Sequence, residues 1–148
     1  MFLLDAKALI ALAWPAHVHH DVMLEWFLRN RKAGWATCAL TQAAFVRIVS
    51  QPAFHTPVVA LADAAGLLSR NLASSDHRFL PLKSHLVDVL THCTGGVVGH
   101  GQVTNAWLIT VAHAHGAMLV TFDQRISTLL ATPKERDRDL LILKLPAH

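Results

Sequence analysis

Two stretches decide the fold: Phe2-Leu3-Leu4-Asp5 near one end of the chain and Ala117-Met118-Leu119-Val120-Thr121-Phe122-Asp123 near the other. Each is a short apolar run followed by a carboxylate, as expected of a buried strand in a parallel sheet. The carboxyl ends of such strands lie along one edge of the sheet, where ligand sites form. We therefore expect Asp5 and Asp123 to share a divalent-metal site, because Mg²⁺ and Mn²⁺ prefer oxygen ligands. The alternative is that each Asp only caps the helix after its strand.

The bulk composition is that of one ordinary globular domain. The chain has 148 residues, of which 53% are apolar, enough to bury a core. No uninterrupted apolar run approaches the ~20 residues that span a bilayer, and the first residues lack the basic start of a secretory signal. Cys38 and Cys93 make no disulfide framework. These features predict a cytoplasmic protein that does not enter a membrane.

The charge is modestly basic. The formal net charge is +3 with eleven histidines counted as neutral, so mild acid would raise it. Such a surface is compatible with a nucleic-acid partner, but the absence of Tyr leaves no obvious aromatic platform for stacked bases.

Strand and helix patterns alternate along the chain. Helices are predicted over 6–13, 17–32, 41–50, 58–71, 83–93, 102–115 and 124–131. The signals are apolar spacing, Thr41 as an N-cap, Pro57 in a first turn, and Gly34 and Gly116 at helix ends. Strands are expected at 2–5, 35–38, 78–80, 117–121 and 139–145, the last after a charged loop at 134–138. The fold class is therefore α/β: a three-layer sandwich with a mainly parallel central sheet and helices on both faces.

Four polar residues are expected at the carboxyl edge of this sheet. Asp5 and Asp123 follow strands, while Gln42 and Asn105 lie in the first turns of the helices predicted at 41–50 and 102–115. Helix amino ends carry partial positive charge and free amide donors, which suits carboxylates, phosphates or polar metal ligands.

Several motifs together resemble the PIN domain, and more narrowly the VapC-type toxins of bacterial toxin–antitoxin pairs. The resemblance covers nearly the whole chain and is carried by Leu4-Asp5 with 9–15, Gly34-Trp35-Ala36-Thr37-Cys38 with Leu40-Thr41-Gln42 and Phe45-Val46-Arg47, Gly99-His100 with Val103-Thr104-Asn105-Ala106, and His115-Gly116 before Thr121-Phe122-Asp123.

This resemblance implies a single PIN-like domain over residues 1–148 and an endoribonuclease that uses Mg²⁺ or Mn²⁺ held by acidic side chains. It also implies a cognate antitoxin that binds the toxin and blocks its site, and a homodimer. The RNA substrate is implied in the same way.

Departures from the family pattern fall on the site itself. The family has Asp where this chain has Asn105, and usually Glu where it has Gln42, although the closest subfamily often has Gln there. The expected metal ligands are thus Asp5, Asn105 and Asp123, whose charge balances one divalent ion better than two. Activity is expected to be attenuated; the alternative is a PIN-fold protein that binds RNA or an antitoxin without cleavage. An engineered Asp-to-Asn change at position 105 would give the same sequence.

Three further residues are assigned around this site. Thr121 is expected to donate its hydroxyl to a phosphate or to a ligand carboxylate. Lys7 either points into the cleft or lies on a solvated helix face. For Arg47, a structural pair with an inner carboxylate is favoured over a substrate contact.

Histidine spacing offers a rival metal site. His17 and His20 have helical zinc spacing, and His113 and His115 lie close together, but neither group has Cys at ligand distance in the sequence. Surface histidines are the simpler interpretation. Trp14, Trp26 and Phe27 are consistent either with core packing or with a partner surface.

Overall fold

The computed structural model describes residues 1–147. Five parallel strands form one sheet in the order β3-β2-β1-β4-β5. Their bounds are β1 Phe2–Leu4, β2 Trp35–Thr37, β3 His77–Phe79, β4 Met118–Thr121 and β5 Leu140–Ile142. The chain builds β1, β2 and β3 outward in one direction and then places β4 on the other side of β1. Ligand sites form at such a switch point, beyond the carboxyl ends of the strands.

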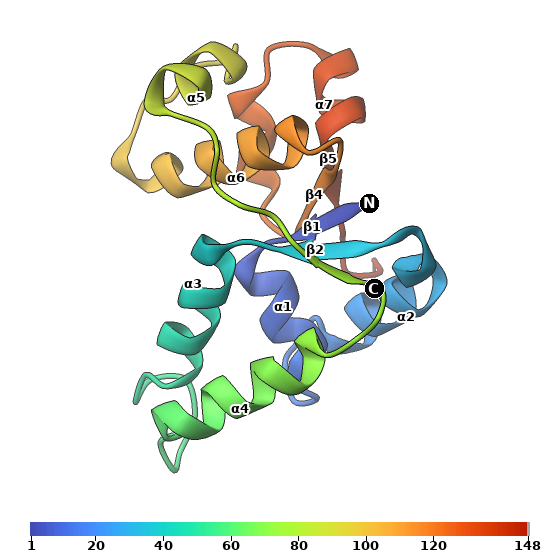
Figure 1. Ribbon diagram of the computed structural model, residues 1–148, viewed down its shortest axis with the longest axis vertical. Coiled ribbons are helices and arrows are strands. Elements are labelled where there is room, and N and C mark those ends of the chain that lie inside the picture. Colours follow the sequence, from blue (N-terminus) through green and yellow to red (C-terminus); the bar gives the residue numbers. More distant parts are fainter. Residues whose placement is uncertain (148) are drawn as a thin grey trace.

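Helices cover both faces of the sheet (Figure 1). One side carries α1 (Ala6–Ala13), α2 (His20–Asn30), α3 (Ala39–Val49) and α4 (Leu61–Leu72). The other carries α5 (Leu86–His92), α6 (Val103–Ala114) and α7 (Pro133–Asp139). Short 3₁₀ helices occupy Arg31–Ala33, His100–Gln102 and Gln124–Leu129. The predicted α/β sandwich with a parallel sheet is confirmed.

Two hydrophobic cores lie on the two faces of the sheet. Leu3 and Leu119 point into the core beneath α5 and α6, whereas Leu4 and Val120 point into the core formed with α1 to α4. This alternation along paired strands is what buries both faces of the apolar runs. Phe27 belongs to the second core, and Trp14 and Trp26 are partly buried and pack against it, so packing accounts for all three.

Several predicted boundaries are wrong. The charged segment 134–138 is helical, because Thr132 accepts a hydrogen bond from the Glu135 amide and Glu135 accepts one from the Thr132 amide, with Pro133 in the first turn. Helix α3 begins before Thr41, whose hydroxyl accepts from the Cys38 amide instead of capping as N-cap. Pro57 follows a cis peptide bond and lies outside α4, which begins at Leu61.

Within residues 1–147, no helix combines the length and apolarity needed to cross a membrane.

Candidate active site

The two aspartates from opposite ends of the chain meet at the carboxyl edge of the sheet. β1 and β4 are neighbours with Leu4 opposite Val120, and the Asp5 amide donates to the Val120 carbonyl at 3.1 Å. Asp5 and Asp123 line one cavity of about 310 Å³. The convergence expected from the sequence is therefore present in the structure.

Five of the seven residues assigned from the sequence line this cavity: Asp5, Lys7, Arg47, Asn105 and Asp123. Thr41, Thr104 and Leu40 complete much of its wall. Thr121 and Gln42 do not line it, because both side chains are used in hydrogen bonds behind the wall.

Asp5 is both a helix cap and a cavity residue. Its Oδ1 accepts from the Ala8 amide at 2.7 Å, which makes Asp5 the N-cap of α1, and its Oδ2 accepts from the Thr121 hydroxyl. Asp5 is only 6% exposed. Burial raises the pKa of Asp5 from 3.8 to about 6, although the hydrogen bonds from Thr121 and Ala8 and the charge of Lys7 oppose the rise.

Thr121 connects the Asp5 carboxylate to the backbone of Asp123. Its hydroxyl donates to Asp5 and accepts from the Asp123 amide at 3.0 Å. Thr121 is fully buried, and its hydroxyl bonds to the Asp5 carboxylate rather than facing the open side of the cavity. This hydroxyl fixes the position of Asp5 relative to the backbone of Asp123.

Asp123 has an ion-pair partner that the sequence reasoning missed. Arg125 donates through Nε to Oδ1 and through Nη2 to Oδ2, both at 3.0 Å, and its amide also donates to Oδ1. These bonds from Arg125 lower the pKa of Asp123 below its usual value, against an opposing effect of burial. The signal available in the sequence was that Arg125 follows Asp123 by two residues. A carboxylate that caps a 3₁₀ turn lies close to the side chains at the start of that turn.

Lys7 and Arg47 are the cations at the mouth of the cavity. Both are exposed, and neither forms an ion pair with another of residues 1–147. The structural pair favoured for Arg47 is therefore absent, because its position on α3 faces solvent and the cavity. For Lys7, the structure combines both expected placements, a solvated helix face and the cleft.

Asn105 lies between two cavities. It belongs to the first turn of α6 and lines both the cavity with Asp5 and a neighbouring one of about 280 Å³, which Asp123, Arg125, His100 and Gly99 also line. Asn105 is half-buried at this junction, so its amide oxygen is available to a ligand in either cavity.

Gln42 is turned away from the cavity. Its Nε2 donates to the Thr37 hydroxyl at 2.9 Å, and that hydroxyl lies 2.8 Å from Nε2 of His77 on the neighbouring strand. Burial, and then the charge of Arg78, lower the pKa of His77. Gln42 can therefore act on the cavity only through the backbone of α3 or after a change of rotamer.

The donor set fits a hard divalent cation. Asp5, Asp123 and Asn105 line the same small cavity, and carboxylate and amide oxygens without nitrogen or sulfur ligands suit Mg²⁺ or Mn²⁺. The buried Asp5 carboxylate gains from a nearby cation, since burial alone favours its neutral form.

Comparison with known proteins agrees with this geometry. The profile of the family described as PIN domain matches residues 2–129. The chain belongs to the PIN-domain family. It is 42% identical to Ribonuclease VapC38 of Mycobacterium tuberculosis, over 97% of this chain and 99% of the relative. It is also 36% identical to Ribonuclease VapC44 of the same species, over 95% of this chain and 98% of the relative.

A solved structure supports the fold of this PIN domain. VapBC2 from Rickettsia felis, bound to a DNA fragment from their promoter, aligns with a TM-score of 0.65, covering 97% of this chain and 98% of that chain, at 13% identity. At that identity the likeness concerns the fold alone. The sequence resemblance to VapC-type PIN domains is thus confirmed by the family match and by the two relatives.

Among residues 1–147, neither His17 with His20 nor His113 with His115 falls together in a group of three or more His, Cys, Asp or Glu side chains at ligand spacing. His17 and His19 pack with ring centroids 5.4 Å apart, His19 stacks on Phe122, and His20 bonds to the Ala11 carbonyl. His115 bonds to the Pro81 carbonyl, but His113 lies beside Asp139 and His92. His92 and Asp139 were not assigned from the sequence.

Proposed function

We propose that this PIN domain is a divalent-metal-dependent endoribonuclease that hydrolyses RNA phosphodiesters, and the toxin of a toxin–antitoxin pair. The observation that carries the proposal is the convergence of Asp5, Asp123 and Asn105 on one cavity with Lys7 and Arg47 at its mouth. Oxygen ligands inside and cations outside suit a bound metal ion next to a phosphate. The relatives named as ribonucleases support RNA as the substrate.

Each residue has a distinct role in this proposal. Asp5 and Asp123 hold Mg²⁺ or Mn²⁺, and Asn105 acts as a neutral oxygen ligand or orients a water. The bound ion supplies Lewis-acid polarisation of a phosphate oxygen and lowers the pKa of a bound water. Lys7 and Arg47 bind RNA phosphates at the mouth of the cavity. Thr121 keeps Asp5 in position through its hydrogen bond. Gln42 supports the cavity wall through its hydrogen bond to Thr37.

Residue 105 sets the strength of the site. An amide at this position leaves Asp5 and Asp123 as the carboxylates among the cavity-lining residues, which balances one divalent ion. Two unit charges about 4 Å apart interact by roughly 4 kcal/mol at an effective dielectric near 20, before solvation is subtracted. We infer that Asn105 attenuates metal binding and cleavage. The second candidate, a protein that binds RNA or antitoxin without cleavage, is favoured by this same amide.

The deciding experiment compares the wild type with Asn105→Asp on a fluorogenic RNA, with millimolar Mn²⁺ or Mg²⁺ and with a chelator. We expect Asn105→Asp to tighten Mn²⁺ binding about tenfold to a hundredfold, since desolvation offsets part of the charge interaction. Asp5→Asn and Asp123→Asn should remove cleavage, whereas Asp63→Asn, an exposed aspartate on α4, should leave it unchanged. Cleavage that survives chelator and both site variants would end the nuclease proposal. RNA binding without cleavage in both the wild type and Asn105→Asp would select the second candidate.

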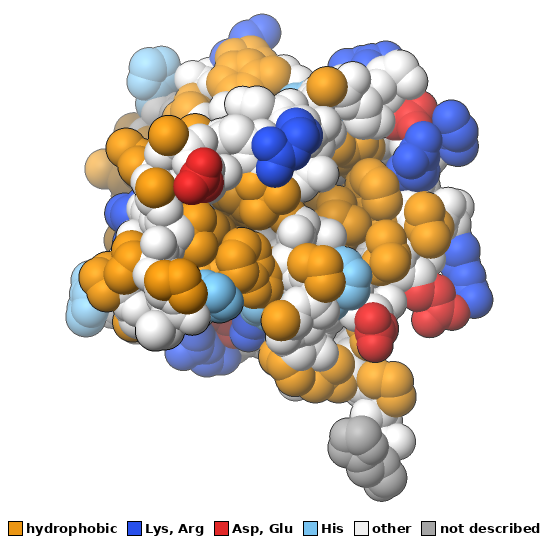
Figure 2. All heavy atoms as spheres, turned by 90° about the horizontal axis from the view of Figure 1, so that it is seen from below, with side chains coloured by type: hydrophobic (Ala, Val, Ile, Leu, Met, Phe, Trp, Pro, Cys, Tyr) orange, Lys and Arg blue, Asp and Glu red, His pale blue; other side chains and the backbone are white. Residues whose placement is uncertain are grey.

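We further propose a cognate antitoxin and a homodimer as partners of a single domain that works in the cytoplasm. Figure 2 views the molecule from below relative to Figure 1 and shows hydrophobic side chains gathered over the middle of that face. Val58 in the segment before α4, Leu61 at the start of α4 and Leu28 on α2 are among the exposed apolar residues. Co-purification with a co-expressed antitoxin, and the mass of the isolated toxin in solution, test these two partners.

A further inference from the structure

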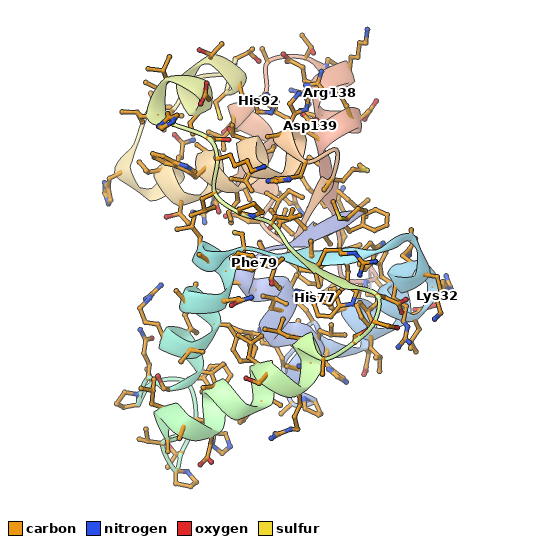
Figure 3. All side chains as sticks on the ribbon, viewed as in Figure 1. Lys32, His77, Phe79, His92, Arg138 and Asp139 are labelled. Carbon is orange, nitrogen blue, oxygen red and sulfur yellow. The ribbon has the colours of Figure 1, made fainter. Side chains whose placement is uncertain are left out.

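The carboxyl ends of three helices meet on the side of the sheet that carries α5, α6 and α7. His92 is the last residue of α5, His113 lies in the last turn of α6, and Asp139 is the last residue of α7. One ligand atom from each lies within 4.8 Å of the others. Among residues 1–147, no other group of three or more His, Cys, Asp or Glu side chains has this spacing. Figure 3 labels His92, Asp139 and Arg138 close together in the region of α5, α6 and α7.

Asp139 is a buried carboxylate that is kept charged. It is 1% exposed and accepts from Arg138 Nε at 2.8 Å, from Arg138 Nη2 at 2.7 Å and from His113 Nδ1 at 2.8 Å. Burial raises the pKa of Asp139, but the hydrogen bonds from Arg138 and His113 outweigh it, so the pKa lies below its usual value. A carboxylate must be ionised to bind a metal, and Asp139 is ionised at neutral pH.

His92 carries an unexplained nitrogen. Its Nε2 is buried and 3.1 Å from Asp139 Oδ2, yet it is not aligned for a hydrogen bond with that oxygen or with another atom of residues 1–147. Buried polar atoms without a partner are rare in folded proteins, and an ion beside this nitrogen would satisfy it. Burial, and then the charge of the stacked His113 ring 4.4 Å away, lower the pKa of His92. The neutral imidazole is the form that binds metals.

We propose that His92, His113 and Asp139 form a second metal site, which takes a borderline divalent transition metal such as Zn²⁺. Two imidazoles and one carboxylate match the ligands of zinc, whereas Mg²⁺ and Mn²⁺ prefer oxygen alone. A surface groove of about 620 Å³, lined by His92, His113 and Glu135 among others, gives water and metal ions access to both histidines.

Arg138 is compatible with this ion. Each carboxylate oxygen offers more than one lone-pair site, so Asp139 can bind a cation and keep both bonds from Arg138. The ion takes the place of the proton between His113 and Asp139, and Arg138 remains as the partner that orients a ligating carboxylate.

The site is separate from the cavity at Asp5 and Asp123. His113 and Asn105 lie in opposite end turns of α6, eight residues or about 12 Å apart along the helix axis. Asp139 precedes the amino end of β5, whereas Asp123 follows the carboxyl end of β4. The two cavities share no lining residue. An ion bound here ties α5, α6 and α7 together and stabilises that side of the molecule.

The test uses tag-free protein treated with chelator, then titrated with Zn²⁺ by calorimetry and with Co²⁺ by visible absorption. We expect one equivalent of each metal beyond any bound at the Asp5 and Asp123 cavity, a Co²⁺ spectrum typical of four-coordinate nitrogen and oxygen ligands, and a rise in melting temperature of about 5 to 10 °C with Zn²⁺ at a hundredfold excess over Kd. Replacement of either histidine by Gln should weaken binding about 100-fold or more.

Two matched variants separate this site from the others. His17→Gln removes a histidine from the rival surface group, and Asp123→Asn weakens the proposed catalytic site; both should keep the Co²⁺ spectrum. The His113 side chain is 41% exposed, so His113→Gln should fold even if His92→Gln does not. Absence of binding in the wild type, binding that survives His92→Gln and His113→Gln, or binding that is lost in His17→Gln or Asp123→Asn would overturn the proposal.

Discussion

Replacement of Asp5 by Asn should stabilise the metal-free protein while it removes metal-dependent cleavage. Asp5 is 6% exposed, and burial raises its pKa from 3.8 to about 6. The folded protein therefore holds the Asp5 proton more tightly than the unfolded chain does. As pH rises from about 4 to about 6, the unfolded chain releases this proton first, and the free energy of unfolding falls.

The size of the effect follows from the shift. A difference of about two pKa units corresponds to about 3 kcal/mol of unfavourable ionisation in the folded state above pH 6. Asn keeps an oxygen for the Ala8 amide, but its NH₂ group replaces the acceptor of the Thr121 hydroxyl, which offsets about 1 kcal/mol. We expect a net gain of about 2 kcal/mol at pH 7.5, or about 4 to 8 °C in melting temperature.

The assay is urea unfolding of both proteins in chelator at pH 4.5, 6 and 7.5. The gain from Asp5→Asn should be small at pH 4.5 and largest at pH 7.5. Asp123→Asn is the matched control with the opposite sign: hydrogen bonding from Arg125 lowers the pKa of Asp123, so its charge contributes stability above about pH 4 that is lost on acidification. A loss of stability in Asp5→Asn at pH 7.5, or a gain that does not change with pH, would refute the reasoning.

Three other substitutions test single contacts. Thr121→Val leaves Oδ2 of Asp5 and the Asp123 amide without a partner, so we expect a loss of about 1 to 3 kcal/mol by urea unfolding, with Thr121→Ser near wild type. Arg125→Gln removes the two side-chain hydrogen bonds from Arg125 to Asp123 and should tighten Mn²⁺ binding severalfold, as measured by calorimetry. An unchanged affinity would mean that Arg125 does not compete with the ion. Thr132→Ala removes the N-cap of α7 and should cost about 1 kcal/mol with cleavage unchanged, whereas a matched Thr91→Ala on α5 should cost less.

The sheet and the two aspartates were predictable because the signal is local. Phe2-Leu3-Leu4 and Met118-Leu119-Val120 are apolar without interruption, which only strands buried on both faces require, and the carboxylate that follows each strand lies at the sheet edge in any parallel arrangement. Asn105 followed from the same logic, because it belongs to the first turn of a helix that begins at this edge.

Side-chain directions and tertiary pairs were not predictable in the same way. Gln42 lies in the first turn of its helix, as predicted. Its side-chain amide, however, donates to the Thr37 hydroxyl, and the sequence does not reveal this pairing. The group of His92, His113 and Asp139 joins residues separated by up to 47 positions, so no ligand spacing could show it. The helix at 133–139 could have been predicted, because Thr132-Pro133-Lys134-Glu135 is a capping box with Pro in the first turn. The high charge of 134–138 instead favoured a loop.

The position of Asp5 explains why a destabilising residue is kept at the centre of this sheet. The chain adds β2 and β3 on one side of β1, and β4 and β5 on the other side. The residue after β1 therefore lies between β2 and β4 and is covered by α1 and by the wall of the cavity. A carboxylate there loses hydration and recovers part of that loss from Thr121 and the Ala8 amide, so its charged form stays unfavourable and its pKa is raised. In the proposed metal site, the same burial that raises the pKa of Asp5 would strengthen its attraction for a metal ion, and with an amide at residue 105 that attraction would rest largely on Asp5 and Asp123.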